Sequence, residues 1–346
     1  MTVNLVTGGS GFVGAHLVAA LRRRGEQVRI LDINEPAEPD PAADFIAASV
    51  TDPIAVAEAM QGVDAVFHTA ANAHLWAKDK STFDRVNRIG TRTVMAAARE
   101  ARVRRVVHTS SLTVLVGRGA RRQRAVVTET TSPARSEMAG PYCRSKYDAE
   151  REVSAAAASG LDVVSVLPTL PVGPGDHGLT APTRMILDFV RRRTPAYLEC
   201  LLNLIDVRDV AEGHVLARDK GTAGERYILG HSNMHLSELL ERLQKISGVA
   251  MPTARVPYGL ALAAAMFSEA AANAITGKPP AAPLTGVRLA GQKVAFESSK
   301  AIGELGLPQS DIDTALRDEI AWFVAKGLVA QAELPQFAST PALSRN

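Results

Sequence analysis

Residues 3–14, with the sequence VNLVTGGSGFVG, decide the fold of this chain. A short apolar run breaks into four glycines within seven residues, and helix-forming residues resume at 15–21. This order is typical of a buried strand, a tight turn and a helix. Because glycine has no Cβ, the turn can adopt positive φ, and its N–H groups can face a pyrophosphate at the helix N-terminus. The spacing fits G-x-G-x-x-G at Gly9, Gly11 and Gly14, and a G-x-x-G-x-x-G variant at Gly8, Gly11 and Gly14.

Strand and helix signals alternate through the first half of the chain. Asp32 ends the second strand, one βαβ unit after the glycine turn, where a carboxylate can bind the hydroxyls of an adenosine ribose. The strands are almost continuously apolar, which is typical of a parallel sheet covered by helices on both faces. The sequence therefore predicts an α/β fold, a Rossmann-type doubly wound parallel sheet. The strand runs are 28–31, 65–68, 106–109 and 163–167, with helices expected at 52–60, 82–101 and 142–159.

The pattern loosens after Pro168. Strand pieces are expected at 205–210 and 225–229, and helices at 237–247, 258–275 and 310–326. We predict a dinucleotide-binding domain and a smaller C-terminal α/β substrate-binding domain, with the chain crossing between them more than once. The first is expected to comprise residues 1–170 with a return segment near 203–230, the second 171–202 and 231–330, and a loose tail 331–346.

Composition and charge exclude several classes of protein. The net charge of +3 is small for 346 residues, and no aromatics are interleaved with the arginine clusters, so nucleic-acid binding is not expected. Cys143 and Cys200 give neither a disulfide framework nor a metal motif, and His68, His74 and His108 have no metal-ligand spacing, so no metal is expected. A reducing, cytoplasmic location follows, because a strand that begins at residue 3 leaves no room for a signal peptide.

Most of the chemistry-bearing residues follow the fourth predicted strand, 106–109. Tyr142 and Lys146 lie at i and i+4 of an expected helix, so both project from one face. The lysine charge is expected to lower the pKa of the phenol from about 10, which suits proton exchange with a carbonyl or alcohol oxygen. Ser110 and Ser111 follow a buried strand at the edge where such sheets bind ligands. Asn87 places an amide inside a helix, where asparagine is mildly unfavourable.

Together these pieces resemble the extended short-chain dehydrogenase/reductases, the NAD-dependent epimerase/dehydratase group. Four further segments, 68–77, 224–230, 286–290 and 299–306, are similar to a narrower branch of dihydroflavonol-reductase-like and hopanoid-associated epimerase-like proteins, with 3β-hydroxysteroid dehydrogenases as cousins. The pieces that match the wider family are TGGSGFVG at 7–14, Asp32, HTAA at 68–71, Asn87-x-x-Gly90-Thr91, TSS at 109–111, Tyr142-x-x-x-Lys146 and GPGD at 173–176.

The resemblance implies a role for each of these residues. Tyr142 would be the general acid/base, Lys146 would tune it and hold the nicotinamide ribose, and Ser111, or alternatively Ser110, would orient the substrate oxygen. Asn87 would support the catalytic group. The implied cofactor contacts are Gly8, Gly11, Phe12, Val13, Gly14, Asp32, Ser49, Val50, Ala70, Ala71, Tyr142, Lys146, Pro168 and Leu170. The implied substrate contacts are Trp76, Thr113 and Arg184.

Asp32 favours NAD(H), because its carboxylate would repel the 2′-phosphate of NADP(H). NADP(H) is the alternative, if Arg22–Arg24 neutralise that phosphate. The family's Gly-Asp before the third helix is replaced here by Ala48-Ser49, so the adenine contact of that acid must be weaker or made by the main chain.

Two segments have open interpretations. The arginine-rich loop 117–124 is either a solvated flap or a lip that attracts an anionic substrate group. The apolar helix 258–275 either packs on the second domain or forms a lid or a membrane-surface contact. Its most apolar stretch, 259–267, is too short for a membrane span, which needs about 20 residues. A homodimer through a helix bundle is implied only by the resemblance.

The expected function is hydride transfer between a nicotinamide and a carbonyl or alcohol carbon of a bulky, largely apolar small molecule. The first alternative is a nucleotide-sugar epimerase or dehydratase that retains its NAD. The second, from another class, is a dinucleotide-binding sensor without chemistry, which has no need for a tuned phenol.

Overall fold

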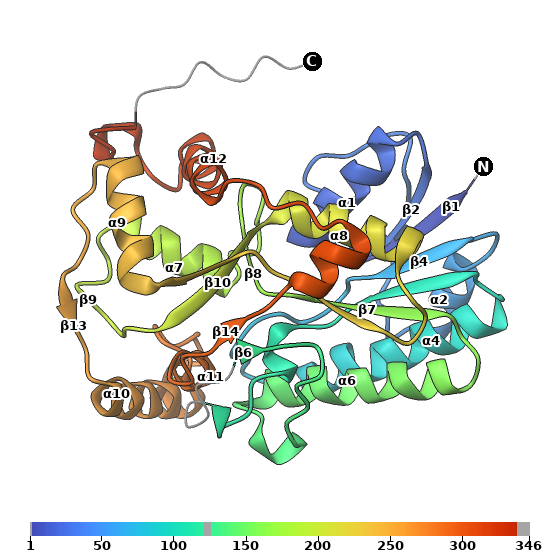
Figure 1. Ribbon diagram of the computed structural model, residues 1–346, viewed down its shortest axis with the longest axis horizontal. Helices are drawn as coiled ribbons and strands as arrows, with labels where there is room; N and C mark the ends of the chain where they lie inside the picture. The colour runs from blue at the N-terminus through green and yellow to red at the C-terminus, as the bar shows by residue number, and fades with distance from the viewer. Residues whose placement is uncertain (1, 121–125, 338–346) are drawn as a thin grey trace.

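A seven-stranded parallel sheet forms the centre of the computed structural model, which describes residues 2–120 and 126–337 (Figure 1). Its order is β11-β7-β5-β4-β1-β2-β3, so the chain winds outward in both directions from β1. The predicted doubly wound Rossmann-type fold is confirmed. The strands are β1 Val3–Thr7, β2 Gln27–Asp32, β3 Asp44–Ala47, β4 Ala65–His68, β5 Arg105–Thr109, β7 Val163–Pro168 and β11 Arg226–Leu229.

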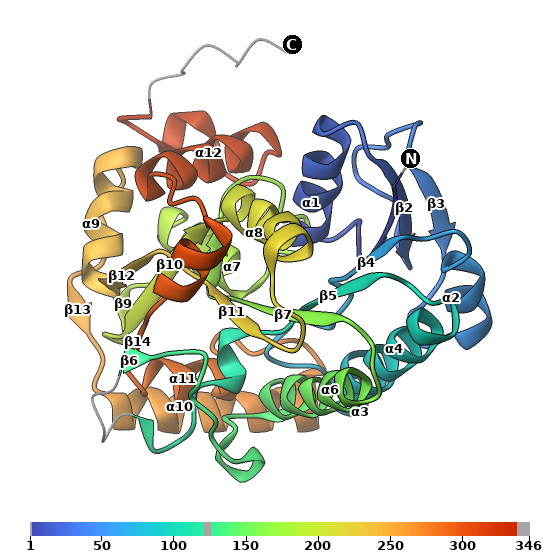
Figure 2. The same ribbon diagram turned by 45° about the vertical axis from the view of Figure 1, so that its right-hand side comes forward.

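Two layers of helices cover the sheet, which explains the continuous apolar strands. Leu5 and Val6 are both fully buried although they point to opposite faces. On one face lie α1 Phe12–Arg23 and α8 Val207–Lys220, and on the other α2 Pro53–Ala59, α4 Gly90–Glu100 and α6 Pro141–Ala158 (Figure 2).

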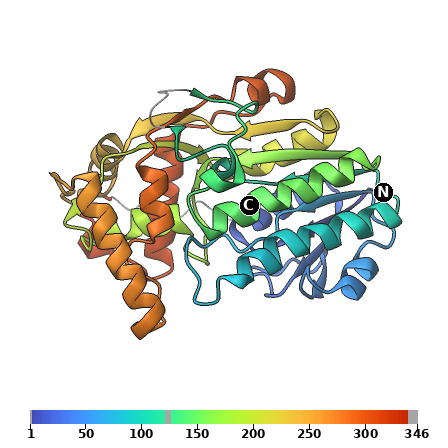
Figure 3. The same ribbon diagram turned by 90° about the horizontal axis from the view of Figure 1, so that it is seen from below.

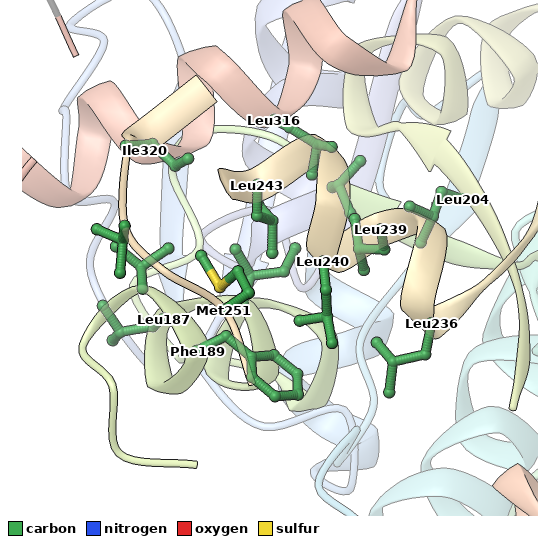
Figure 4. Packing of buried hydrophobic residues seen from close by; sticks show 14 of the residues in the cluster. Leu187, Phe189, Leu204, Leu236, Leu239, Leu240, Leu243, Met251, Leu316 and Ile320 are labelled. Atoms are coloured by element: carbon green, nitrogen blue, oxygen red, sulfur yellow. The ribbon is translucent and has the colours of Figure 1, made fainter. Parts of the chain in front are cut away.

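The second half of the chain builds a smaller sheet, β12-β10-β8, beside the first. Three helices pack on it around the buried leucines drawn in Figure 4. Its elements are β8 Leu170–Val172, α7 Ala181–Val190, β10 Leu201–Asp206, β12 Ser232–His235, α9 Leu236–Ser247 and α12 Ile312–Ala325.

Short elements complete the fold, with α10 and α11 at the lower edge of Figure 1 and β9 and β13 at its left side. Two two-stranded parallel sheets pair β9 with β13 and β6 with β14. The bounds are β6 Val126–Val127, β9 Ala196–Tyr197, β13 Ala254–Arg255, α10 Tyr258–Ala271, π-helical η4 Ala272–Thr276, α11 Leu284–Ala290, β14 Ala295–Phe296 and η5 Ala301–Leu305.

Several predicted elements differ in the structure. The predicted strand 205–210 is wrong, because β10 ends at Asp206, whose carboxylate accepts the Arg208 N–H (2.8 Å) and caps α8. β3 is short and only half-buried, so it gave no apolar signal. The predicted helix 82–101 is three consecutive segments: α3 Ser81–Phe83, π-helical η1 Asp84–Ile89 and α4.

The predicted domain division stays a prediction. β11 from the return segment joins the main sheet, whereas β10 joins the small one. In the predicted loose tail, Gln331–Glu333 form a 3₁₀ turn and residues 338–346 lie outside the described residues. Residues 121–125 of the arginine-rich loop also lie outside them.

Candidate active site

The glycine turn between β1 and α1 is closed too tightly to accept side chains. Gly8 has φ +74° and its N–H donates to the Leu31 carbonyl (2.8 Å). A Cβ on Gly14 would lie 2.1 Å from the Gly8 oxygen, and one on Gly8 would lie 2.6 Å from Ala70. No side chain caps the N–H groups at the start of α1, where Phe12 and Val13 lie. The turn therefore has the bare N-terminus that a pyrophosphate needs, and it fits a dinucleotide.

Asp32 is held at the end of β2 by main-chain donors. Its Oδ2 accepts the N–H of Ser10 (3.1 Å) and its Oδ1 accepts that of Asn34 (3.0 Å). The carboxylate therefore does cap the turn, yet each oxygen can accept a further hydrogen bond from a ribose hydroxyl. Capping and cofactor binding are compatible here.

The next loop brings Ser49 and Val50 to the same edge of the sheet. The Ser49 hydroxyl shares a hydrogen bond with Thr51 (2.8 Å). Val50 is buried, and a Cβ on Gly90 would lie only 2.7 Å from its Cγ2, so α4 begins in close contact with this loop. The main-chain bond from Ala48 N to Asp32 O (3.0 Å) ties the loop to the end of β2.

Tyr142 and Ser111 come together across the ends of α6 and β5. Tyr142 is the second residue of α6, and its phenol hydrogen-bonds the Ser111 side chain. Ser111 in turn accepts hydrogen bonds from the N–H (3.3 Å) and hydroxyl (3.1 Å) of Thr113. Ser110 is buried, and its hydroxyl has no hydrogen-bond partner among the residues that the structure describes. The geometry therefore favours Ser111 over Ser110 as the partner of the phenol.

Burial, and not the lysine, dominates the ionisation of the phenol. Desolvation raises the pKa of Tyr142 to about 12, although the Ser111 hydrogen bond opposes this. The Lys146 ammonium donates to the Thr109 carbonyl oxygen (2.7 Å), and burial lowers its own pKa to about 8. The lowered tyrosine pKa expected from the i, i+4 spacing is therefore not what the structure gives. Tyr142 is a protonated phenol at neutral pH.

Asn87 joins the loop after β4 to α6. It lies in the π-helical segment η1, and its amide donates to Ser145 Oγ (2.8 Å) and to the Asn72 carbonyl (3.1 Å). Its Oδ1 accepts the Asn72 N–H (2.7 Å). Ser145 also donates to the Tyr142 carbonyl (2.7 Å), so Asn87 is linked to the first turn of α6. Asn72 and Ser145 were not singled out from the sequence, because their partners are distant along the chain.

A second buried chain of hydrogen bonds runs beneath this loop. The ring of His68 contacts Thr7 Oγ1 (2.8 Å) on one side and Thr91 Oγ1 (2.9 Å) on the other. Thr91 donates to the Asn87 carbonyl (2.6 Å). Burial lowers the pKa of His68 to about 3, so it is neutral and structural. Among the described residues, no group of three or more His, Cys, Asp or Glu side chains could hold a metal ion.

The remaining residues for which cofactor or substrate contacts are implied lie in several parts of the fold. Pro168 ends β7 and Leu170 begins β8, at the carboxyl edge of the sheet. Ala70 abuts the glycine turn and Ala71 follows it. Trp76 is buried, and its indole N–H donates to Asn273 (3.1 Å). Arg184 is exposed on α7, and its backbone N–H donates to the Thr180 carbonyl (2.9 Å).

Comparison with known proteins identifies the lineage. Residues 4–230 match the model of the NAD dependent epimerase/dehydratase family. The chain belongs to this family. NAD(H), the cofactor inferred from Asp32, agrees with that membership.

Relatives in this NAD-dependent family include several reductases. The chain is 42% identical over 332 residues to a putative dihydroflavonol 4-reductase of Synechocystis sp., covering 94% of this chain and 95% of that protein. It is 34% identical to sterol demethylase protein B of Methylococcus capsulatus, over 94% and 99% of the two chains. A farnesyl-dihydroquinoline-oxide ketoreductase of Stigmatella aurantiaca is also 34% identical, over 87% and 90%. The crystal structure of gox2253 has a TM-score of 0.82 at 36% identity, covering 95% of this chain and all of that one.

Proposed function

We propose that this protein is an NAD(H)-dependent oxidoreductase that interconverts a ketone and an alcohol on a bulky, largely apolar molecule. The observation that carries the proposal is the Tyr142–Ser111 pair. A buried phenol with its proton retained is hydrogen-bonded to a hydroxyl at the carboxyl edge of a dinucleotide-binding sheet. This is a proton donor beside the edge of the sheet where such folds bind their ligands.

The roles of the residues follow from their chemistry. NADH supplies a hydride to the carbonyl carbon when it is bound. Ser111 holds the carbonyl oxygen and Tyr142 delivers the proton that the developing alkoxide needs. A pKa of about 12 keeps Tyr142 protonated, which suits the reduction direction. Lys146 is held by its hydrogen bond to the Thr109 carbonyl, and we expect its ammonium to contact the nicotinamide ribose.

The apolar substrate class is supported by the relatives and by the local surroundings. Two relatives that cover nearly the whole chain are named for sterol and farnesyl-quinoline chemistry. Next to Tyr142, Phe83, Met138 and Cys143 form a buried apolar cluster with Leu75 and Leu289 packed against it. The immediate surroundings of the phenol are therefore mainly hydrocarbon.

The nucleotide-sugar epimerase remains the second candidate function, because it uses the same residues with a retained NAD. Solved epimerases and a dehydratase share the fold at TM-scores of 0.73 to 0.76, but at 19–24% identity. The intact Tyr142, Lys146 and Ser111 argue against a sensor without chemistry.

One experiment separates these functions. The purified protein is assayed for retained NAD by absorbance, and then for NADH oxidation with a panel of bulky apolar ketones. We expect little retained NAD and ketone-dependent NADH oxidation that Tyr142→Phe abolishes. Stoichiometric retained NAD with turnover of a nucleotide sugar, and none of any ketone, would overturn the proposal in favour of the epimerase.

A further inference from the structure

An exposed apolar face runs along the continuous helix formed by α10 and η4. Among the described residues, nine large hydrophobic side chains are exposed, and four of them lie on this one helix. Phe267 and Ile275 are each 82% exposed and Leu260 is 62% exposed. At 3.6 residues per turn, the spacings of seven and eight place these three on one side of the helix. Alanines at 263, 264, 270 and 274, all exposed, fill the space between them.

The opposite side of the helix is fastened to the body of the protein. Glu269 Oε2 accepts the Leu284 N–H (3.1 Å) at the start of α11, and Asn273 accepts the Trp76 indole N–H (3.1 Å). On this side of the helix, its own residues Ala265 and Ala272 are buried. In the view from below, α10 lies at the edge of the molecule with one end projecting (Figure 3). The exposed face is therefore held in a fixed orientation.

Cations lie at both ends of this apolar face. Lys78 and Lys278 are exposed at the C-terminal end and have no ion pair among the residues described, and Lys78 lies close to Gly277. Arg255 and Lys293 are exposed near the N-terminal end, where Arg255 pairs with the half-buried Glu199 (3.2 Å). The acid in α10, Glu269, lies on the fastened side. The face thus combines an apolar centre with positive ends.

Helix Tyr258–Thr276 is also long and apolar enough, by length and composition alone, to cross a membrane. The sequence-based expectation of no span considered only the stretch 259–267, whereas the helix in the structure is 19 residues long. The contacts of Glu269 and Asn273 with the body of the protein nevertheless fit a helix that lies on a surface. Inserting the helix across a bilayer would break both of these contacts.

We propose that the α10–η4 helix binds flat on the surface of an anionic lipid membrane. Leu260, Phe267 and Ile275 would insert at the level of the acyl-chain boundary, and the cations at the two ends would contact lipid phosphates. A second copy of the chain fits less well. In an antiparallel pair of these helices, the cations at each end would face the cations of the other copy and repel them.

This surface is next to the candidate active site. The α11 helix on which α10 packs contacts the start of α6, the helix that carries Tyr142, because a Cβ on Gly140 would lie 2.0 Å from Thr285 Oγ1. Arg288 donates to the Ala139 carbonyl (3.1 Å). Leu289 packs against the apolar cluster around Tyr142. α11 therefore links the proposed membrane surface to the candidate site, and an apolar substrate would arrive from that side. This part of the inference rests on the proposed function, but the membrane binding does not.

The test is sedimentation of the full-length protein with vesicles of phosphatidylcholine, with and without phosphatidylglycerol. We expect binding to the mixed vesicles, and at least about a tenfold loss of partitioning in Leu260→Ser/Phe267→Ser. Lys78→Gln/Lys278→Gln should weaken binding about fivefold per cation on the mixed vesicles only. Ile54→Ser, a substitution of an exposed isoleucine on α2, is the matched control and should bind like the wild type.

Three results would overturn the inference. They are no vesicle binding by the wild type, equal binding by the Leu260→Ser/Phe267→Ser variant, and a concentration-dependent dimer that this variant abolishes while vesicles stay unbound. The measurement needs no turnover, so it succeeds or fails independently of the ketone assay.

Discussion

Replacing Gly14 by alanine should weaken NAD(H) binding without unfolding the protein. The new Cβ would lie 2.1 Å from the Gly8 oxygen, whereas such atoms essentially never approach within 3.0 Å. The first turn of α1 must therefore move away from β1 by roughly 0.9 Å, the difference between these two distances. A hydrogen bond of about 2.9 Å from this turn to a pyrophosphate oxygen would lengthen beyond its useful range.

The expected loss follows from the number of bonds broken. One charge-assisted hydrogen bond contributes about 1.5–3 kcal/mol, so we expect NAD(H) to bind about ten to a hundred times more weakly. Titration calorimetry measures the Kd, and the thermal midpoint shows whether the variant is folded. Gly259→Ala is the control, because this glycine also lies in a helix but a Cβ there meets nothing within 4 Å. Binding by Gly14→Ala within twofold of the wild type would refute the reasoning.

Four further predictions address the other residues. Tyr142→Phe should reduce turnover by about 10²–10⁴-fold with NADH affinity nearly intact, and activity within threefold of wild type would exclude a general-acid role. In the wild type, kcat/KM for ketone reduction should decline above about pH 8, where Lys146 loses its charge, and a profile flat to pH 10 would contradict this. Asp32→Ala should relax the preference for NAD(H), and a tenfold or greater advantage of NADPH in the wild type would show that the interpretation of Asp32 is wrong. Asn87→Ala leaves the N–H and carbonyl of Asn72 unpaired and should lower the free energy of unfolding by about 2 kcal/mol, measured by denaturant titration.

The sequence by itself determined the central sheet and the phosphate turn, because both are encoded by neighbouring residues. Apolar runs of four to six residues produce buried strands, and glycine spacing specifies a turn that no other residue can adopt. The cap that Asp52 provides for α2, with its Oδ1 accepting the Ile54 N–H (3.0 Å), is equally local. The glycine turn, Asp32 and the Tyr142-x-x-x-Lys146 spacing, taken with the other motifs in their order along the chain, also indicated the family.

Tertiary structure decided what depends on pairs far apart in the sequence. The position of Asn87 between Asn72 and Ser145 bridges up to 58 residues and has no local signal. The ionisation of Tyr142 was mispredicted for the same reason: the lysine four residues away is visible in the sequence, whereas the burial that raises the phenol pKa to about 12 comes from the surrounding fold. The exposure of one face of α10 is likewise decided by the tertiary fold, since a helix of the same apolar composition could equally lie in a buried core. Local sequence specifies which residues can make a contact, and only the folded chain decides which of them are desolvated.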